Sequence, residues 1–341
     1  MYQQNMNITR KPIYPDFSKL SYQENNFYEY SPYIISENKN IIDRTWYNNL
    51  SEYCKNLIKN RIKEFEIEDI EIPHPRQSDN EEKFLYKMYR TYIDSFDYNL
   101  WYNSDLKLGP SSVKIIQITN NIKNILINIY EKKHTIGKKE LDKLDKFDEL
   151  DKFDELDSFK NIISSHIEPN VEYFIKLSGT SGKNEKGINK FTNENDIIAH
   201  LVSVKLFVDQ EYKRDKETFL ILMKFDDKID IRNEFRIFVF NKKITGISQQ
   251  SKKLFNYDQD ELDQFVEIFQ QIDFINDLPY VDCILDVYVN IELKKCILIE
   301  INPFGSHCGA GSSLFKWDDD HYILHNNLDE IEFRYLSIIN I

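Results

Sequence analysis

Short apolar runs bounded by turn signals alternate with longer amphipathic segments along the chain. Runs of four to eight aliphatic, β-branched and aromatic residues are typical of strands. They predict strands over Tyr173–Leu177, Lys216–Phe225, Glu234–Phe240, Ile244–Gln249, Cys283–Asn290 and Cys296–Gly305. Apolar residues that recur at helical spacing predict helices over Thr45–Glu66, Glu81–Ser95, Ser112–Lys132, Asp196–Phe207 and Glu261–Phe274.

The last two predicted strands form a hairpin that carries polar side chains within apolar runs. If the turn centres on Leu293, Asp286 lies directly opposite Glu300, because both positions are equally far from the turn. Glu300 and Asn302 then share one face of the strand, roughly 6.6 Å apart. Three oxygen-bearing side chains are thereby expected to converge on one patch.

Two carboxylates opposed on an apolar sheet cost several kcal/mol unless a cation compensates them. Hard oxygen donors without Cys or His at ligand spacing favour Mg²⁺ or Mn²⁺, and Mg²⁺ usually takes one or two carboxylates plus nucleotide phosphates. The sequence therefore predicts a metal site at Asp286, Glu300 and Asn302. The alternative is a half-exposed hairpin whose carboxylates face water.

A loop rich in small residues follows the predicted strand that contains Lys176. It runs from Ser178 to Gly187 and combines hydroxyl residues, glycines and Lys183. Free backbone N–H groups, close approach and positive charge are what a phosphate-covering loop needs. The spacing is not that of a P-loop, since Lys183 is followed by Asn184. A simple surface turn is the alternative interpretation.

Arg236 lies inside the apolar strand Glu234–Phe240 and shares a face with Glu234 and Phe238. A guanidinium in such a strand must pair with an anion. The sequence leaves open whether that anion is a neighbouring Glu or a bound phosphate.

Composition narrows the class of protein. The 341 residues include 44 basic and 57 acidic side chains, a net charge of −13, which argues against a nucleic-acid or anionic-membrane surface as the main partner. The N-terminus lacks an apolar signal region and no run approaches a membrane span. The four cysteines have no CxxC spacing and are expected to be reduced. Together these features predict a cytoplasmic protein.

A six-residue unit, Leu-Asp-Lys-Phe-Asp-Glu, repeats at Leu144–Glu149 and Leu150–Glu155. Six residues match neither the helical period nor a solenoid repeat. We interpret the segment as a low-complexity acidic insertion, with an acidic partner-binding segment as the alternative. The expected organisation is a helical N-terminal region with part of a first subdomain (1–135), the insertion (136–165), a core (166–317) and a C-terminal tail (318–341).

Several of these motifs, in this order, resemble the cell division cycle protein 123 (D123) family. They are Lys176 in FIKLS, Glu234-Phe-Arg-Ile-Phe-Val with Gly246-Ile-Ser-Gln249, Asp286 in LDVYV, and Glu300-Ile-Asn-Pro-Phe-Gly305. The resemblance covers roughly residues 172–317. It implies the ATP-grasp fold, an α+β fold in which two α/β subdomains with antiparallel sheets grip ATP.

The resemblance also implies roles for individual residues. Lys176 would contact the α- or β-phosphate, and Ser178, Gly179, Ser181 and Lys183 would belong to the loop over the triphosphate. Met223, Lys224 and Phe225 would form the hinge that bonds adenine, with Asp230 a candidate for the ribose. Arg236 would hold the γ-phosphate, and Asp286, Glu300 and Asn302 would carry Mg²⁺. Glu300 stands where family members generally have Asp.

Two functions are consistent with this resemblance. Relatives in the family are ATP-dependent chaperones that bind the γ subunit of eukaryotic translation initiation factor 2 and promote assembly of that factor, and catalysis is not required of them. The alternative is an ATP-grasp ligase that joins a carboxylate to an amine through an acyl phosphate. A ligase needs an acceptor pocket, for which His307 and Cys308 are the only candidates.

Overall fold

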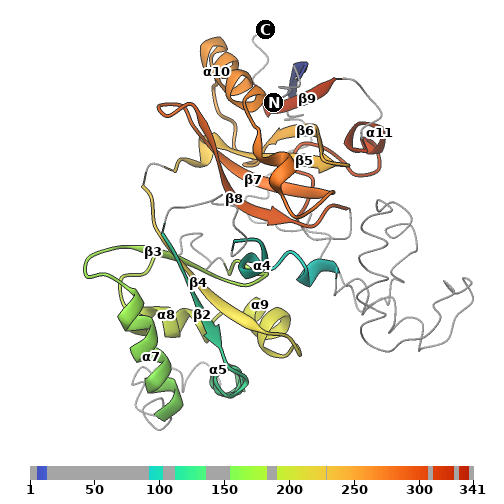
Figure 1. The fold of residues 1–341 in the computed structure, drawn as a ribbon. Helices are drawn as coiled ribbons and strands as arrows, with labels where there is room; N and C mark the ends of the chain where they lie inside the picture. The colour runs from blue at the N-terminus through green and yellow to red at the C-terminus, as the bar shows by residue number, and fades with distance from the viewer. Residues whose placement is uncertain are drawn as a thin grey trace, which may run out of the picture. The chain divides into compact units, whose positions relative to one another are not determined.

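The computed structural model describes residues 6–13, 92–102, 112–135, 154–182, 190–227, 229–305, 310–325 and 330–337 (Figure 1). These residues form two compact units. Unit 2 contains residues 97–103 and 110–227, and unit 1 contains the remainder. No helix in the described segments has both the length and the apolar character needed to cross a membrane.

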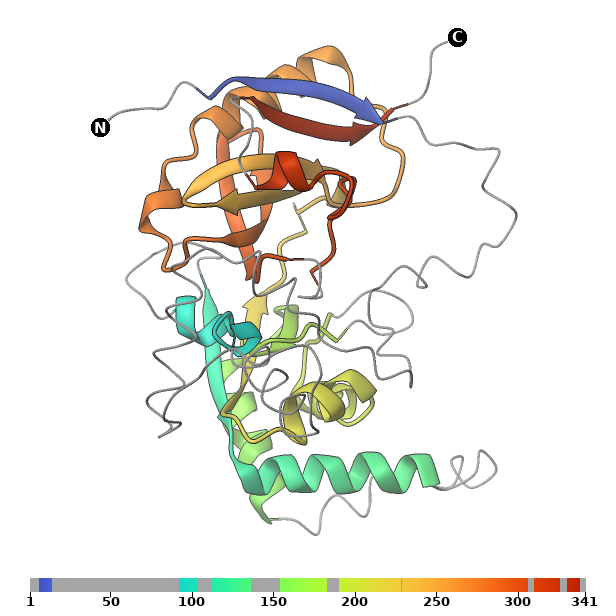
Figure 2. The same ribbon diagram turned by 90° about the vertical axis from the view of Figure 1, so that its right-hand side faces the viewer.

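Unit 1 is built on a six-stranded sheet in the order β1-β9-β6-β5-β7-β8. Its strands are β1 (Ile8–Ile13), β5 (Glu234–Phe240), β6 (Lys243–Gln249), β7 (Cys283–Asn290), β8 (Lys295–Asn302) and β9 (Ile331–Leu336). Neighbours are antiparallel except that β9 runs parallel to both β1 and β6. Figure 2 shows β1, in blue, lying along β9 at one edge of the sheet. β8 forms the other edge.

Local turn chemistry joins the central strands. Asn241 and Lys242, between β5 and β6, both have positive φ angles of 50° and 61°, as a two-residue hairpin turn requires. Between β7 and β8 the Asn290 side chain accepts a hydrogen bond from the Leu293 N–H at 2.9 Å. The register shifts between Asp286 and Val287, where β8 carries an extra residue. Asp286 nevertheless pairs with Glu300, which confirms the predicted register.

Both faces of the unit 1 sheet are covered. On one face α10 (Gln259–Gln270) packs Phe265 and Phe269 against Phe235 of β5, with ring centroids 4.8 and 5.2 Å apart. Side chains alternate along a strand, so Arg236 and Phe238 point to the opposite face. There a second cluster gathers around Phe238, and it consists of Ile284, Phe304, Phe315 and Leu324, the last from α11 (His321–Leu324). Short 3₁₀ turns occupy Ile231–Asn233 and Phe274–Asp277.

Unit 2 contains a three-stranded antiparallel sheet in the order β2-β4-β3 with helices packed on it. The strands are β2 (Val113–Ile118), β3 (Tyr173–Leu177) and β4 (Thr218–Lys224). The helices are α4 (Tyr98–Tyr102), α5 (Asn120–Thr135), α7 (Asp154–His166), α8 (Glu194–Leu201) and α9 (Lys205–Phe207), followed by a π-helical turn (Val208–Tyr212). Apart from α4, these elements share one core, in which Leu126, Leu156, Ile163 and Ile175 are fully buried.

The predicted helix over Ser112–Lys132 is wrong in its first part. Val113–Ile118 is strand β2, and the helix α5 begins only at Asn120 (Figure 2). The spacing of the isoleucines in this run fits both a helix and a strand. The run forms a strand because it pairs with β4. The helix begins where the Thr119 hydroxyl accepts from the Ile122 N–H at 3.3 Å, as an N-cap does.

The predicted helix over Asp196–Phe207 is also interrupted. α8 ends at Leu201, and Val204 is already extended before the short α9. The Ser203 hydroxyl donates to the His200 carbonyl at 2.9 Å. In a continuing helix that carbonyl would accept from the N–H of residue 204, so the serine competes with the helix.

The bounds of other predicted elements can be compared with those in the structure. β3 and β5 match their predicted bounds, and α10 covers most of the predicted Glu261–Phe274. The last part of the segment 136–165 is the helix α7, whose Leu156, Phe159 and Ile163 are buried in the unit 2 core. The predicted helix over Thr45–Glu66, most of that over Glu81–Ser95, and Lys183, His307 and Cys308 lie outside the described residues.

Candidate functional site

Four of the predicted site residues form a row across three neighbouring strands of unit 1. Arg236 on β5 pairs directly with Asp286 on β7, and Asp286 pairs with Glu300 on β8. Asn302 lies two positions further along β8, opposite Ile284. The row exists because Arg236, Asp286 and Glu300 are paired in register within apolar runs, and Asn302 shares the β8 face with Glu300.

Arg236 and Asp286 form a bidentate ion pair. The guanidinium Nε and Nη2 each donate to one Asp286 carboxylate oxygen at 2.8 Å, and Nη1 donates to the Gly311 carbonyl at 3.1 Å. Both side chains are almost fully buried. Burial would lower the pKa of Arg236, but the charge and hydrogen bonds of Asp286, and the charge of Glu300, raise it. The anion that the sequence required for Arg236 is therefore, in this structure, a carboxylate of the neighbouring strand.

Asn302 extends this arrangement toward β8. Its Nδ2 donates to Asp286 Oδ2 at 3.1 Å, which leaves the amide oxygen Oδ1 to act as a ligand. Glu300 and Asn302 are half-buried, so a cation approaching this edge strand reaches them from solvent. Among the described residues, no group of three or more His, Cys, Asp or Glu side chains is arranged to hold a metal. Two carboxylates and one amide fit Mg²⁺ that arrives with nucleotide phosphates better than a metal held by protein alone.

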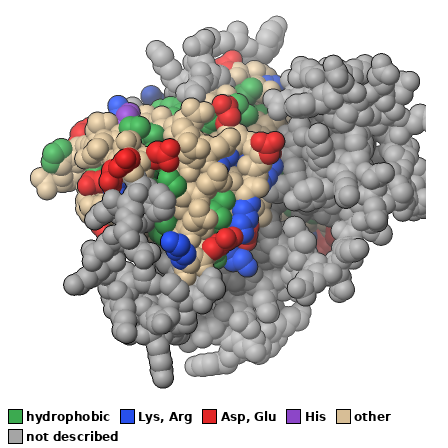
Figure 3. All heavy atoms as spheres, turned by 90° about the horizontal axis from the view of Figure 1, so that it is seen from below, with side chains coloured by type: hydrophobic (Ala, Val, Ile, Leu, Met, Phe, Trp, Pro, Cys, Tyr) green, Lys and Arg blue, Asp and Glu red, His purple; other side chains and the backbone are tan. Residues whose placement is uncertain are grey.

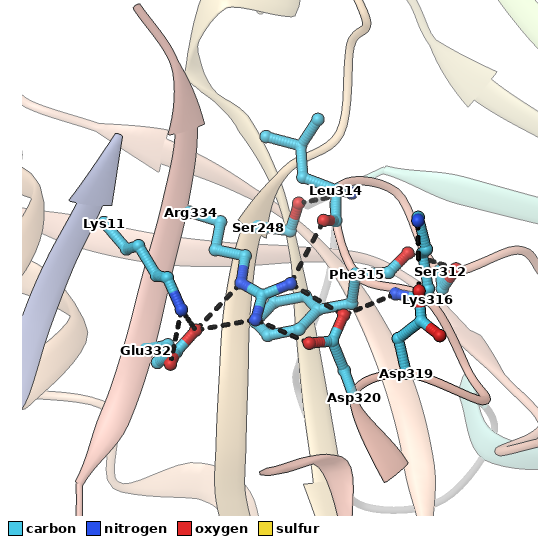
Figure 4. Close-up of polar contacts among 10 residues, drawn as sticks. All are labelled: Lys11, Ser248, Ser312, Leu314, Phe315, Lys316, Asp319, Asp320, Glu332 and Arg334. Carbon is cyan, nitrogen blue, oxygen red and sulfur yellow. Dashed lines mark hydrogen bonds and ion pairs between the residues drawn. The ribbon is translucent and has the colours of Figure 1, made fainter. Parts of the chain in front are cut away.

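The loop that brings Gly311 to Arg236 is fixed by a second arginine (Figure 4). Arg334 of β9 makes two 2.7 Å contacts with the Asp320 carboxylate, one from Nη1 and one from Nη2. It also pairs with Glu332 and lies 3.9 Å from the Phe315 ring centroid. Figure 4 shows Lys11 of β1 on the far side of Glu332, at 3.0 Å. Through these contacts the residues 312–320 are held against the sheet, with Gly311 at a positive φ of 72°.

Other predicted site residues lie in unit 2, at the end of β3. Lys176 is buried, with its Nζ 5.2 Å from the centroid of the Tyr98 ring. The Ser178 hydroxyl accepts from the Phe219 N–H at 2.8 Å, and the Ser178 carbonyl accepts from the Tyr98 N–H at 2.7 Å. The Gly179 N–H donates to Glu211 Oε1 at 3.1 Å. Ser181 is half-buried, next to Gly182, whose carbonyl lies 3.0 Å from His200 Nε2.

The predicted hinge lies at the other end of this strand pair. Met223 and Lys224 are in the central strand β4, and the Phe225 N–H donates to the Glu172 carbonyl at 2.8 Å. Ser178 bonds to Phe219, so the loop and Met223 lie about 13 Å apart along the strand, at ~3.3 Å per residue. Asp230 lies in unit 1 and caps the turn Ile231–Asn233 by accepting from the Arg232 N–H at 2.9 Å.

Sequence reasoning missed a buried charge network beside the β3 loop. Lys216 Nζ lies 2.9 Å from Asp97 Oδ2 and 3.0 Å from Glu211 Oε2, and both carboxylates are buried. Asp97 is far from the other two residues in the chain, and Glu211 and Lys216 stand in a charged stretch, where each looks like a surface residue in the sequence. In the structure, a Cβ at Gly179 would lie 2.6 Å from Asp97 Oδ1, a proximity that no local sequence pattern indicates.

Comparisons with known proteins show one family to which part of this chain is similar. Residues 186–340 match the model of the family described as D123. That stretch includes Arg236, Asp286, Glu300 and Asn302, and it begins after β3.

Two curated relatives match parts of the chain. A translation initiation factor eIF2 assembly protein from Vanderwaltozyma polyspora is 30% identical over 115 residues, which cover 32% of this chain and 30% of that protein. A CDC123-like protein from Acanthamoeba polyphaga mimivirus is 28% identical over 189 residues, 48% of this chain and 55% of that protein. The chain thus spans about half the length of these relatives or less.

A solved structure has the same fold. Cdc123 from Schizosaccharomyces pombe superimposes with a TM-score of 0.56 at 20% identity, covering 72% of this chain and 97% of that one. The α+β architecture that the sequence predicts is thereby confirmed.

Proposed function

Because residues 186–340 match the D123 family, we propose that this chain is a member of that family and an ATP- and Mg²⁺-binding assembly factor for translation initiation factor 2. The match of residues 186–340 to that family carries the proposal, together with the relative that is named for eIF2 assembly. ATP and Mg²⁺ stabilise the partner-binding conformation in this proposal, and turnover is not required.

Within unit 1, taken by itself, the proposal assigns the metal ligands. Glu300 and the Asn302 amide oxygen hold Mg²⁺ with the phosphates, and Asp286 completes the set through the oxygen lone pairs that Arg236 and Asn302 do not use. Arg236 stands beside them as the phosphate-binding cation. The support for this assignment is the row of directly paired residues on β5, β7 and β8.

Within unit 2, taken by itself, the proposal assigns two groups of residues. Lys176 and the loop from Ser178, including Gly179, Ser181 and Lys183, serve the phosphates. Met223, Lys224 and Phe225 serve the adenine, and Asp230 of unit 1 serves the ribose. The distribution of these residues at opposite ends of the β3–β4 pair supports the separation of a phosphate end from a base end.

The proposed partner is the γ subunit of initiation factor 2, bound in the cytoplasm through protein contacts alone. A net charge of −13 opposes direct binding to nucleic-acid phosphates or to an anionic membrane. On the face seen in Figure 3, acidic and basic side chains of the described residues are interspersed, as on many protein-binding surfaces. No feature of the described residues favours the carboxylate–amine ligase, so we do not propose that activity.

Calorimetric titration with ATP, with and without Mg²⁺, tests the nucleotide part of the proposal. We expect Mg²⁺-dependent binding and no ADP release. Co-purification of the full chain with recombinant initiation factor 2 γ subunit tests the partner. Absence of ATP binding contradicts the first part, and absence of γ-subunit capture in the presence of Mg²⁺ and ATP contradicts the second.

A further inference from the structure

A buried carboxylate holds the turn that follows β3. Glu211, in the π-helical turn Val208–Tyr212, is 1% exposed. Its Oε1 accepts from the Gly179 N–H at 3.1 Å and from the Thr180 hydroxyl at 2.8 Å. A backbone N–H and a hydroxyl from consecutive loop residues commonly bind anions, and here they bind an anion that belongs to the protein.

Lysine side chains within unit 2 offset the negative charge of Glu211. Lys216 bridges Glu211 and Asp97, with its Nζ 3.0 and 2.9 Å from the two carboxylates. A second ammonium, that of Lys123, donates to the Lys216 carbonyl and to the Arg214 carbonyl. Burial lowers the pKa of Lys123, and the charge of Glu211 partly offsets that effect. Several buried charges cost free energy that a hydrophobic core would not, so a purely stabilising role is a weak explanation for this network.

Further hydrogen bonds hold the turn Ser178–Thr180 in place. The Leu177 N–H donates to the Thr180 carbonyl at 2.9 Å, and Ser178 bonds to Phe219 and Tyr98. Gly179 itself is exposed, but a Cβ there would lie 2.6 Å from Asp97 Oδ1 and 3.3 Å from Glu211 Oε1. The carboxylates therefore lie directly against the backbone of the turn and fix its path.

The same contacts surround Lys176, the proposed phosphate ligand. Tyr98, whose N–H binds Ser178, also places its ring 5.2 Å from Lys176 Nζ. Resting on the proposed ATP binding, we infer that Glu211 is a positioning residue that presets the turn Ser178–Thr180 beside Lys176 for nucleotide phosphates. A turn that is ordered before binding loses less conformational entropy when the phosphates arrive. Glu211 acts through the turn and does not touch the nucleotide.

Calorimetry with ATP, ADP and adenosine tests this inference on the full chain. Glu211→Ala is expected to weaken ATP and ADP binding by roughly tenfold or more, the size expected for losing hydrogen bonds to a charged group. Adenosine, which has no phosphates, should bind with unchanged affinity. Glu211→Gln keeps an oxygen for the Gly179 N–H and should recover part of the ATP affinity. Glu217→Ala is the matched control, because Glu217 is an exposed acid on the same segment.

Hydrogen exchange separates positioning from folding. Glu211→Ala should speed exchange of the Leu177 and Gly179 amides while the β2-β4-β3 ladder stays protected. Equal losses of ATP and adenosine binding, or no loss of either, overturn the inference. If Glu211→Ala does not fold, Glu211→Gln carries the test, and wild-type ATP affinity in that variant overturns the inference. Failure of the wild-type protein to bind ATP instead overturns the proposed function, and the inference falls with it.

Discussion

The Arg236 guanidinium and the Asp286 carboxylate face each other across neighbouring strands, with two nitrogen–oxygen distances of 2.8 Å. A protein cation thus already neutralises one of the two carboxylates on which the proposed metal site depends. Glu300, on the next strand, adds a second negative charge that also raises the pKa of Arg236. The pair therefore links the stability of unit 1 to the chemistry of its proposed site.

Breaking this pair on one side should destabilise unit 1. Asp286→Asn leaves a buried guanidinium without its counterion, so we expect the free energy of unfolding to fall by about 3–5 kcal/mol. Urea unfolding followed by circular dichroism measures the change. Replacing both partners, as Arg236→Met with Asp286→Leu, should cost less than the sum of the single changes. Strict additivity would show that the two side chains are not coupled.

Loss of the β8 ligands should affect nucleotide binding without affecting folding. Glu300→Gln with Asn302→Ala is expected to weaken Mg²⁺-dependent ATP binding by roughly tenfold or more, because both oxygen ligands are replaced while the half-buried edge strand keeps its pairing. Calorimetry with and without Mg²⁺ measures this effect. Glu292→Gln, at an exposed position in the turn of the same hairpin, is the control. Retained Mg-ATP affinity in the double variant would refute the metal assignment.

His200 should make unit 2 less stable in mild acid. Burial lowers the pKa of His200 below 6.5, and the hydrogen bond to the Gly182 carbonyl only partly offsets this. The unfolded chain then binds the proton at a higher pH than the folded chain, so stability falls as the pH drops below about 6.5.

Unfolding free energies of wild type and His200→Gln between pH 5.5 and 7.5 test this expectation. The advantage of the wild type should be largest at neutral pH and should shrink toward pH 5.5. A difference that stays constant across this range would contradict it.

Gly182→Ala should disturb the same loop by crowding. A Cβ at this position would collide with the Phe207 ring, which is fully buried. We expect a loss of about 1–3 kcal/mol, typical of overpacking, and faster hydrogen exchange near Gly182. Combining Gly182→Ala with Phe207→Leu should restore part of the loss, and no rescue would indicate that the ring is not the obstacle.

Arg334→Lys should loosen the loop that carries Gly311. Lysine cannot reproduce the two-pronged contact with Asp320 or the stacking on Phe315. Hydrogen exchange of the Phe315 and Asp320 amides, which are bonded within this loop, should increase. Lys316→Ala, which removes an exposed ion pair with Asp319, serves as the control and should leave these amides unchanged.

Local patterns predicted β3 to β8 and the hairpin register, but among the described strands β1 and β9 were not predicted and β2 was predicted as a helix. Asp286 and Glu300 could be paired from the sequence because a short turn fixes which residues are equidistant from it. The partner of Arg236 could not be chosen, because Asp286 lies on a strand that is brought alongside only by the tertiary fold. For the same reason the Asp97, Glu211 and Lys216 network was invisible. Val113–Ile118 shows a different limit, since an isoleucine-rich run satisfies both helical and strand periods.

The parallel pairing of β1 with β9 has a consequence for how the protein is made. During synthesis, residues 8–13 have no strand partner until residues 331–336 have been made. Every strand of unit 2, in contrast, is complete by residue 224. Unit 2 can therefore fold while the ribosome is still producing β5 to β9. The sheet of unit 1 is completed last, because β1 pairs with a strand that is very distant in the sequence. Contacts of such large sequence separation form slowly. Until then the exposed edge of β6 is the surface most at risk of pairing with another nascent chain.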